Sequence, residues 1–298
     1  MFYGVFTPMV TVFDDQGRLD PDGNRRMIRH LLDGGVHGVL ILGSIGEFFA
    51  LAPDEKRQLI DLAVESAGGR IPVLVGTGGT EVGEVIELTR YAARSGAKAG
   101  VAISPYYFTL DQKGLYRYYA AIARAVEWPL LLYNFPDRTG VELSPELILR
   151  LAREFPHVVG VKDTVDSISH TRAVIELVKP TRPDFAVLSG FDEYLVPNLI
   201  AGGDGLIGGL SNVAPKLLLE LYQACRLGEM AKLKARQRRV NKLMGLYSVS
   251  QLFVDAIKGA VSLVVPGVRP VCRTPAGKLD EKQMATIRAL LKAADVLP

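Results

Sequence analysis

The stretch Pro156-His157-Val158-Val159-Gly160-Val161-Lys162-Asp163-Thr164 contains a short apolar run that ends in charged and polar residues. An apolar run without polar alternation is typical of a strand covered on both faces, as in a parallel sheet. Seven similar runs occur elsewhere in the chain, and each is followed by a polar turn and a segment with helical spacing. The eight runs are residues 4–10, 38–42, 73–76, 100–103, 130–133, 159–162, 186–188 and 205–207.

Amphipathic segments between these runs predict helices. Two of them carry start signals, Pro53-Asp54-Glu55 and Pro145-Glu146, with proline and acids in the first turn. Eight alternations of strand and helix predict a closed (β/α)8 TIM barrel, although an open doubly wound sheet uses the same units. The predicted helices among the strands span residues 23–34, 53–67, 80–95, 111–125, 144–154 and 167–178.

The pattern changes after the eighth run, because four helical segments follow with no strand between them. They span residues 214–227, 230–246, 249–263 and 280–294. We therefore predict a catalytic barrel over residues 1–226 and a C-terminal helical extension over residues 227–298 that packs on the barrel.

Composition excludes several functional classes. The chain has 298 residues, 48% of them hydrophobic, which suffices for a large core. Its net charge of +3 is slight and its charges are interleaved, so we expect no nucleic-acid or membrane partner. Cys225 and Cys272 have no metal or disulfide spacing. Residues 1–10 lack a leader pattern and no segment reaches membrane-spanning length, so a soluble cytoplasmic protein with small-molecule substrates is predicted.

Lys162 is the main candidate for a chemically active side chain. Burial disfavours an ammonium and lowers the pKa of a lysine, so a shielded Lys162 would attack a carbonyl group and form a Schiff base. The alternative is a strand-ending lysine whose amine reaches solvent. Lys258 also lies in apolar company, in the segment 253–261, but a helical lysine needs only one polar side and is the weaker candidate.

Residues at the carboxyl ends of the strands form the active site in barrels of this kind. The backbone N–H groups of Gly43-Ser44-Ile45-Gly46 are suited to hold a carboxylate, although a plain glycine turn has the same sequence. Tyr133 ends a strand beside Lys162 and is suited to shuttle protons, although an isolated tyrosine is more often a packed core residue. The strand ends also contribute Tyr107, Arg138, Thr164, Gly190, Asp192 and Glu193.

The sequence lacks the motifs that typically bind a metal ion or a nucleotide phosphate. The four histidines are scattered through helices and strand starts, so we expect no metal site. Residues 76–80, Gly-Thr-Gly-Gly-Thr, lack the lysine that completes a P-loop and are interpreted as a tight turn. The histidines are His30, His37, His157 and His170.

Together, these strand-end motifs resemble the dihydrodipicolinate synthase and N-acetylneuraminate lyase family, class I pyruvate lyases built on a (β/α)8 barrel with a C-terminal helical extension. The resemblance implies that Lys162 forms an imine with pyruvate or another 2-keto acid and that Tyr133 is the acid/base group. It also implies homotetramers, often dimers of dimers, and no metal or organic cofactor. The other matching positions are Ser44 and Ile45 for the pyruvate carboxylate, Ser44 and Tyr107 for triad hydroxyls, Tyr107 commonly from a neighbouring subunit, and Gly190 and Ile207 for the pyruvyl pocket.

The strand-end residues are compatible with two branches of this family, which differ in their substrates. Thr164, Asp192 and Glu193 resemble hydroxyl-binding positions, and the motifs around Lys162 resemble the aldolases of 2-keto-3-deoxy sugar acids. Arg138 instead resembles the arginine with which the synthases bind aspartate semialdehyde. We favour cleavage of a 2-keto-3-deoxygluconate or pentonate type of substrate. A dihydrodipicolinate synthase and a barrel that only binds a small molecule are the alternatives.

Overall fold

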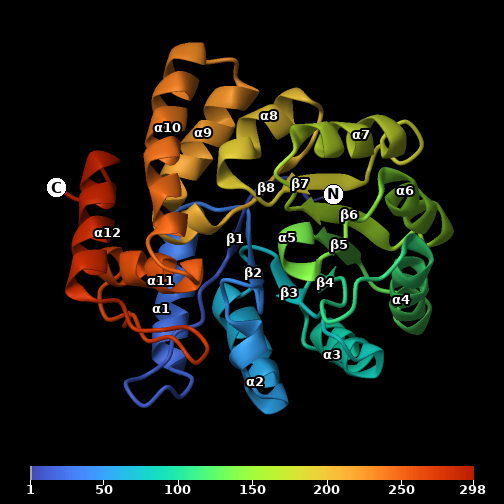
Figure 1. Cartoon of the computed structure of the whole chain (residues 1–298), viewed down its shortest axis with the longest axis horizontal. Helices are drawn as coiled ribbons and strands as arrows, with labels where there is room; N and C mark the ends of the chain where they lie inside the picture. Colours follow the sequence, from blue (N-terminus) through green and yellow to red (C-terminus); the bar gives the residue numbers. More distant parts are fainter. Residues whose placement is uncertain (1) are drawn as a thin grey trace. The chain divides into compact units, whose positions relative to one another are not determined.

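The computed structural model describes residues 2–298 (Figure 1). Eight strands pair in chain order and close into a barrel. The (β/α)8 prediction is confirmed, and closure excludes the open doubly wound sheet, which would leave two edge strands. The strands are β1 (Gly4–Pro8), β2 (Gly38–Ile41), β3 (Val73–Gly76), β4 (Ala99–Ile103), β5 (Leu130–Asn134), β6 (Val158–Asp163), β7 (Ala186–Ser189) and β8 (Gly205–Ile207).

Helices follow the strands at nearly all the predicted positions. Those among the strands are α1 (Pro21–Asp33), α2 (Pro53–Ala67), α3 (Val82–Arg94), α4 (Gln112–Ala125), α5 (Pro136–Thr139), α6 (Pro145–Glu154), α7 (Ile168–Val178) and α8 (Leu195–Ile200). After β8 come α9 (Pro215–Arg226), α10 (Met230–Leu243), α11 (Phe253–Val264) and α12 (Glu281–Ala293). The four helices predicted after the last strand are therefore confirmed.

Packing divides the chain into two compact units. The first contains Leu74–Ile207 with the N-terminal residues through Gly4, and the second contains Val5–Val73 and Gly208–Pro298. The predicted boundary between residues 226 and 227 rests on a change from strands to helices, not on packing, and it stays a prediction.

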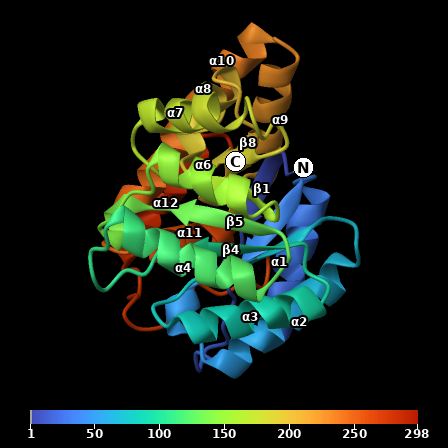
Figure 2. The ribbon, with the colours of Figure 1, turned by 90° about the vertical axis from the view of Figure 1, so that its right-hand side faces the viewer.

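The first unit has its core between the sheet and helices α4, α6 and α7. Figure 2 shows β4 and β5 side by side with α4 along them, and in Figure 1 α6 lies beside β6 and α7 beside β7. Each Leu or Ile side chain that this core removes from water contributes ~1.5–3 kcal/mol. Fully or nearly fully buried members include Leu115, Tyr119, Leu132, Ile148, Leu151, Val174 and Phe185.

Helix α6 illustrates how local sequence sets up this unit. The Ser144 hydroxyl accepts a hydrogen bond from the Leu147 N–H at 3.2 Å, and Pro145 occupies the first turn. The Ser144 N–H donates to the Gln112 side chain of α4 at 3.1 Å, which fixes where α6 begins. The loop of residues 140–143 is thereby held between α4 and the strands.

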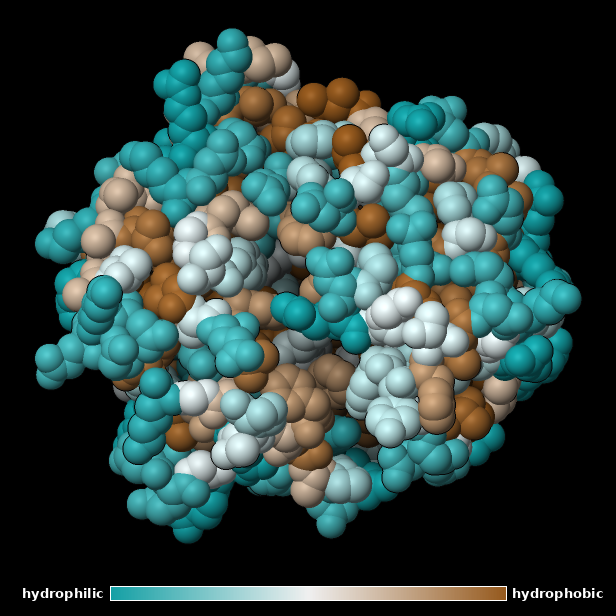
Figure 3. Space-filling view, in the orientation of Figure 1, coloured by the Kyte–Doolittle hydropathy of each residue, from teal (hydrophilic) through white to brown (hydrophobic). Residues whose placement is uncertain are grey.

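The second unit contains β1, β2 and six long helices. Helix α1 packs on α2, α9 on α10, and α11 on α12. Helix α10 contains a basic stretch, residues 231–242. Most of its residues are exposed, and Figure 3 shows hydrophilic residues over this region. No helix in the described residues is long and apolar enough to cross a membrane.

Several element boundaries differ from the predicted ones. Strand β2 ends before Leu42, which has a left-handed φ of 55° that extended backbone does not allow. Helix α1 begins at Pro21, two residues earlier than predicted, because the Asp20 carboxylate caps the Gly23 N–H. Helices α5 and α8 were not predicted. They have four and six residues, too few to show a helical period.

Candidate active site

Strands β5 and β6 bring Tyr133 and Lys162 together. The two residues are direct partners in the register of the parallel pair. The Lys162 Nζ lies 4.1 Å from the centre of the Tyr133 ring, within the range of a cation–π contact. Lys162 is 4% exposed and Tyr133 is 5% exposed. The side chain at position 162 is therefore shielded and faces the phenol, as the buried-lysine hypothesis requires and the solvent-exposed alternative does not.

The two functional groups have no competing protein partners in their own unit. Within residues 74–207, no ion pair or hydrogen bond involves the Lys162 amine, and none involves the Tyr133 hydroxyl. The Lys162 amine is therefore not engaged in an ion pair within this unit. The geometry suits a nucleophilic amine with a proton-transfer group beside it.

A line of side chains extends from Lys162 along β5 and past its end. The Phe135 ring stacks on Tyr133 with the ring centres 5.9 Å apart. The Arg138 guanidinium lies 5.6 Å from the centre of the Phe135 ring. Tyr133 and Phe135 lie on the same side of the chain because side chains alternate along a strand. Arg138 lies in α5, just past the end of β5, and is exposed. Its guanidinium contacts Phe135, which in turn stacks on Tyr133.

Thr164 and Gly190 fit against each other at the ends of β6 and β7. Thr164 is 5% exposed, and its hydroxyl is buried with no hydrogen-bond partner among the described residues. A β-carbon at position 190 would lie 1.7 Å from that hydroxyl oxygen, so only glycine fits beside Thr164. The unpaired hydroxyl retains its capacity for a hydrogen bond to a ligand.

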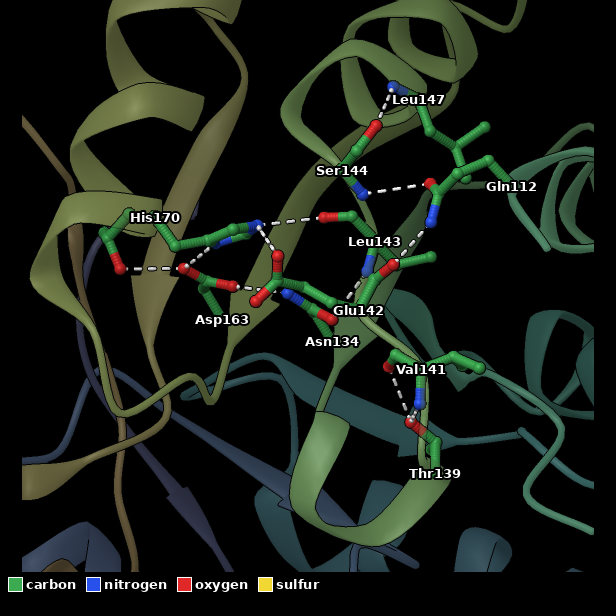
Figure 4. Close-up of polar contacts among 11 residues, drawn as sticks. Gln112, Asn134, Thr139, Val141, Glu142, Leu143, Ser144, Leu147, Asp163 and His170 are labelled. Carbon is green, nitrogen blue, oxygen red and sulfur yellow. Dashed lines mark hydrogen bonds and ion pairs between the residues drawn. The ribbon is translucent and has the colours of Figure 1, made fainter. Parts of the chain in front are cut away.

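A buried polar network lies behind the two catalytic candidates (Figure 4). Asp163 follows Lys162 in β6 and therefore points to the opposite face of the sheet. Its fully buried carboxylate accepts hydrogen bonds from Asn134 Nδ2 at 2.9 Å, Thr171 Oγ1 at 2.7 Å and His170 Nδ1 at 3.1 Å. These donors come from β5 and α7, so the carboxylate joins both elements to β6.

His170 connects this carboxylate to the loop before α6. Its Nε2 lies 2.9 Å from the Leu143 carbonyl oxygen and 3.8 Å from Glu142 Oε1. Burial acts to lower the pKa of His170, but the hydrogen bond to Asp163 and the negative charges of Asp163 and Glu142 outweigh it. The pKa of His170 is therefore raised above its usual value.

The remaining candidates of the first unit lie at the expected strand ends. Tyr107 is 82% exposed in the loop after β4 and packs edge to face with Phe108. Asp192, in a short 3-10 helix after β7, is 1% exposed, whereas Glu193 is half-buried. Ile207 ends β8 and is buried.

Ser44 and Ile45 belong to the second unit, in the turn after β2. The turn is held from within, since the Glu47 N–H donates to the Ser44 carbonyl at 3.2 Å and the Thr11 hydroxyl donates to the Gly46 carbonyl at 2.6 Å. Ile45 is buried, and its methyl group occupies the space that a side chain at position 209 would need. These hydrogen bonds fix the backbone of the turn, as a backbone site for an anion requires.

Lys258, the competing lysine, is fully buried in α11 of the second unit. Its amine pairs with the Glu47 carboxylate and donates to the Val271 carbonyl at 2.8 Å. The Phe13 ring lies on another side, 4.5 Å from the Lys258 Nζ. An amine in this arrangement is an ion-pair partner rather than a nucleophile.

Sequence reasoning missed the hydrogen-bond network of Asn134, Asp163, His170 and Thr171. The available signal was the acid directly after Lys162 at the end of an apolar strand, because a buried carboxylate requires donors.

No group of three or more His, Cys, Asp or Glu side chains suited to hold a metal occurs among residues 2–298.

Comparison with known proteins shows that the chain is similar along nearly its whole length to enzymes of one family. YagE of Escherichia coli strain K12, provisionally named a 2-dehydro-3-deoxy-D-gluconate aldolase, is 38% identical over 98% of this chain and 97% of its own. Its crystal structure in complex with pyruvate superimposes with a TM-score of 0.97, at 37% identity and complete coverage of both chains.

Two further relatives represent both branches of the family. YjhH of the same strain, provisionally named a 2-dehydro-3-deoxy-D-pentonate aldolase, is 37% identical over 100% of this chain and 99% of its own. The 4-hydroxy-tetrahydrodipicolinate synthase of Methanopyrus kandleri is also 37% identical, over 99% of this chain and 97% of its own.

The fold and the relatives define a barrel lyase of the aldolase type. Residues 1–294 match the Dihydrodipicolinate synthetase family, and the chain belongs to that family.

Proposed function

We propose that the enzyme cleaves a 2-keto-3-deoxy sugar acid reversibly to pyruvate and a hydroxyaldehyde, either glyceraldehyde or glycolaldehyde. The observation that carries this proposal is the shielded Lys162 amine, unpaired within its unit, 4.1 Å from the Tyr133 ring. Such an amine is suited to attack the keto carbon of a 2-keto acid.

The proposed mechanism begins with imine formation. The Lys162 amine adds to the keto carbon, water leaves, and a protonated imine results. This iminium withdraws the electrons of the C3–C4 bond, so that bond breaks and an enamine forms. Tyr133 removes the proton of the C4 hydroxyl as the aldehyde leaves. Protonation of the enamine at C3 and hydrolysis of the imine then release pyruvate, and condensation follows the same steps in reverse.

The family resemblance assigns binding of the substrate carboxylate to the backbone of Ser44 and Ile45, and it assigns Gly190 and Ile207 to the pyruvyl pocket. The covalent lysine supplies the electron sink, so the proposed chemistry needs no metal or organic cofactor. Tyr107 would complete the hydroxyl triad from a neighbouring subunit. Its 82% exposure in a single chain leaves the side chain accessible to a neighbouring subunit.

The choice of a sugar acid rests on hydroxyl-binding capacity. Thr164 presents a buried hydroxyl without a protein partner, and Asp192 and Glu193 place two carboxyl groups after β7. Both YagE and YjhH are provisionally named as sugar-acid aldolases, which supports the same choice. A substrate with several hydroxyl groups would give the Thr164 hydroxyl a hydrogen-bond partner.

A second candidate function is the condensation of pyruvate with aspartate semialdehyde, as in the synthase branch. Arg138 is the residue that favours it, since its guanidinium is held over Phe135 in line with Tyr133 and Lys162. A guanidinium there is suited to the carboxylate of an acidic aldehyde.

Borohydride trapping tests the common chemistry. Reduction in the presence of pyruvate should add mass at Lys162, and a protein left unmodified would support a barrel that only binds a small molecule. A panel then separates the two enzymatic functions by comparing pyruvate release from 2-keto-3-deoxygluconate and 2-keto-3-deoxypentonate with condensation of aspartate semialdehyde. We expect Arg138→Leu to retain sugar-acid cleavage, and activity in the condensation assay alone would reverse the choice.

A further inference from the structure

The strongest feature outside the proposed chemistry is the buried pair formed by His170 and Asp163. The side chain of His170 is 7% exposed and that of Asp163 is 0% exposed. Figure 4 shows the imidazole between the Asp163 carboxylate on one side and Leu143 and Glu142 on the other. Buried polar groups are normally hydrogen-bonded, so the partners of this carboxylate and this imidazole show what the pair does.

Both ring nitrogens of His170 face oxygen acceptors. Nδ1 lies 3.1 Å from a carboxylate oxygen of Asp163, and Nε2 lies 2.9 Å from the Leu143 carbonyl oxygen. A carbonyl oxygen and an ionised carboxylate only accept hydrogen bonds, whereas a neutral imidazole has a single N–H. The ring satisfies both contacts only when both nitrogens carry protons, so the geometry requires the imidazolium form.

The pair holds the two strand ends that carry the catalytic candidates. Asp163 and Asn134 are cross-strand partners, and their side chains are hydrogen-bonded. The Asn134 Oδ1 accepts from the Leu143 N–H at 3.0 Å, and the Asn134 backbone carbonyl accepts from the Thr164 N–H at 2.8 Å. The residues that follow Tyr133 and Lys162 are therefore fixed by one charged network.

The same network reaches β7. The Asp163 backbone carbonyl accepts from the Gly190 N–H at 2.8 Å. Gly190 and Thr164 are in close contact, so a shift of Asp163 would move both. The network thus connects three neighbouring strand ends, although none of its side chains faces the Lys162 amine.

We propose that the His170 imidazolium and the Asp163 carboxylate form a positioning pair, which holds Tyr133 against Lys162 and loosens when the ring loses its proton. This inference rests on the proposed function, because it assigns those two residues to catalysis. His170 acts through Asp163 and Asn134 and does not touch the substrate.

The pair predicts a loss of activity on the alkaline side. The charged groups that face the His170 ring are Asp163 from β6 and Glu142 from the loop before α6. Both are acids, so the pKa of His170 is raised and the imidazolium persists above the usual range for histidine. As the pH rises through that raised value, one hydrogen bond is lost and a ring lone pair faces an oxygen.

The first test uses the unaltered protein. Selective ring labelling and nuclear magnetic resonance should show a doubly protonated His170 at neutral pH that titrates above the usual value. The turnover rate for pyruvate release should decline with the same midpoint. A neutral His170 at neutral pH would overturn the proposal. The protonation state measured by nuclear magnetic resonance does not depend on whether the sugar acid is the substrate.

The second test compares two variants with a matched control. His170→Asn retains one neutral donor and should lower turnover ~3-fold, whereas His170→Leu removes both donors and should lower it ~30-fold, because small displacements of catalytic groups have large effects. In both variants the alkaline decline at the His170 midpoint should disappear. His157→Asn is the control, since the His157 ring lies 3.0 Å from the Ala123 carbonyl oxygen and packs against Phe155, and it does not contact the Asp163 network.

Three outcomes separate the two proposals. Pyruvate trapping at Lys162 that persists in His170→Leu while cleavage slows supports positioning. A pH profile that is unchanged in His170→Asn overturns it, even if the variant is less stable. Failure of wild type to trap pyruvate would reject the proposed function instead, and the protonation state of His170 would still be measured. If His170→Leu does not fold, the wild-type titration and His170→Asn decide.

Discussion

Two lysines are buried among residues 2–298, and their partners differ. Lys258, in α11, is fully buried and pairs with the Glu47 carboxylate. Lys162, in β6, is nearly as buried but faces the Tyr133 ring, and no carboxylate pairs with it within its own unit. Burial alone therefore does not identify a nucleophile. The partner of the amine decides whether its lone pair is available for reaction.

The surroundings of Lys258 form a structural cluster. Glu47 has a left-handed φ of 54° and also accepts a hydrogen bond from the Arg273 N–H at 2.8 Å. The Phe13 ring lies 4.5 Å from the Lys258 Nζ and 4.4 Å from the Arg273 guanidinium. Every charge in this cluster has a partner, so we expect changes there to alter stability before they alter chemistry.

Lys162→Met gives the largest expected effect. The change removes the amine and keeps a side chain of similar length, so turnover should fall ~10⁴-fold or more. The thermal midpoint should stay the same or rise, because an apolar side chain suits the site. Pyruvate release, borohydride trapping and thermal unfolding check this, and residual trapping at another residue would reassign the nucleophile.

Lys258→Met should have the opposite profile. It leaves the buried Glu47 carboxylate without its partner, so the free energy of unfolding should fall by ~3–5 kcal/mol in urea titrations. Imine trapping at Lys162 should persist in the folded fraction. Adding Glu47→Gln should restore part of the loss, because no unpaired buried charge then remains. A stable Lys258→Met without trapping would contradict the contrast between the lysines.

Tyr133→Phe separates the ring from the hydroxyl. The ring beside Lys162 is kept, so pyruvate trapping should stay within a few-fold of wild type. Cleavage should slow ~100-fold, since a general acid/base group typically contributes at least that factor. Single-turnover measurements of trapping and cleavage provide the comparison. Unchanged turnover would remove Tyr133 from its assigned role.

Arg273→Gln gives the smallest expected effect. The Arg273 guanidinium hydrogen-bonds both oxygens of Glu55, at 2.6 Å each, and lowers the pKa of that carboxyl. Because the folded pKa is below the unfolded one, the stabilisation exists above the unfolded pKa and is lost as the pH falls through the folded value. We expect a loss of ~1 kcal/mol near pH 7 that shrinks in acid.

Urea titrations at several pH values measure that loss. Lys232→Gln serves as the control, because it removes an exposed pair with Glu229 and should cost less. A loss in Arg273→Gln that does not change with pH would show that the ion pair is not responsible, and would point to packing over Phe13 or to the hydrogen bonds from Arg273 to the Gly17 and Ala50 carbonyls.

The sequence was sufficient to predict the fold and to predict that Lys162 and Tyr133 lie close together. Eight apolar runs predicted eight strands, because strands covered on both faces have near-continuous apolar sequence. Lys162 and Tyr133 were identifiable because reactive residue types ended such strands. Their contact then follows from parallel register, which brings equivalent strand ends side by side.

The polar network was not predictable in the same way. The contact of His170 with Asp163 depends on how α7 packs over β6, and local sequence does not set that packing. The sequence also did not show that Lys258 has a carboxylate partner. That partner, Glu47, is 211 positions away from Lys258 in the sequence. Helix α5 was missed because four residues show no period, even though Pro136 occupies its first position.

The tight fit between Gly190 and Thr164 limits how the enzyme can be redesigned. A methyl group at position 190 cannot be accommodated while the threonine remains, so single replacements there should yield damaged proteins instead of new selectivities. Libraries that vary both positions together, for example Gly190→Ala combined with Thr164→Gly, would reach variants that stepwise mutagenesis would miss.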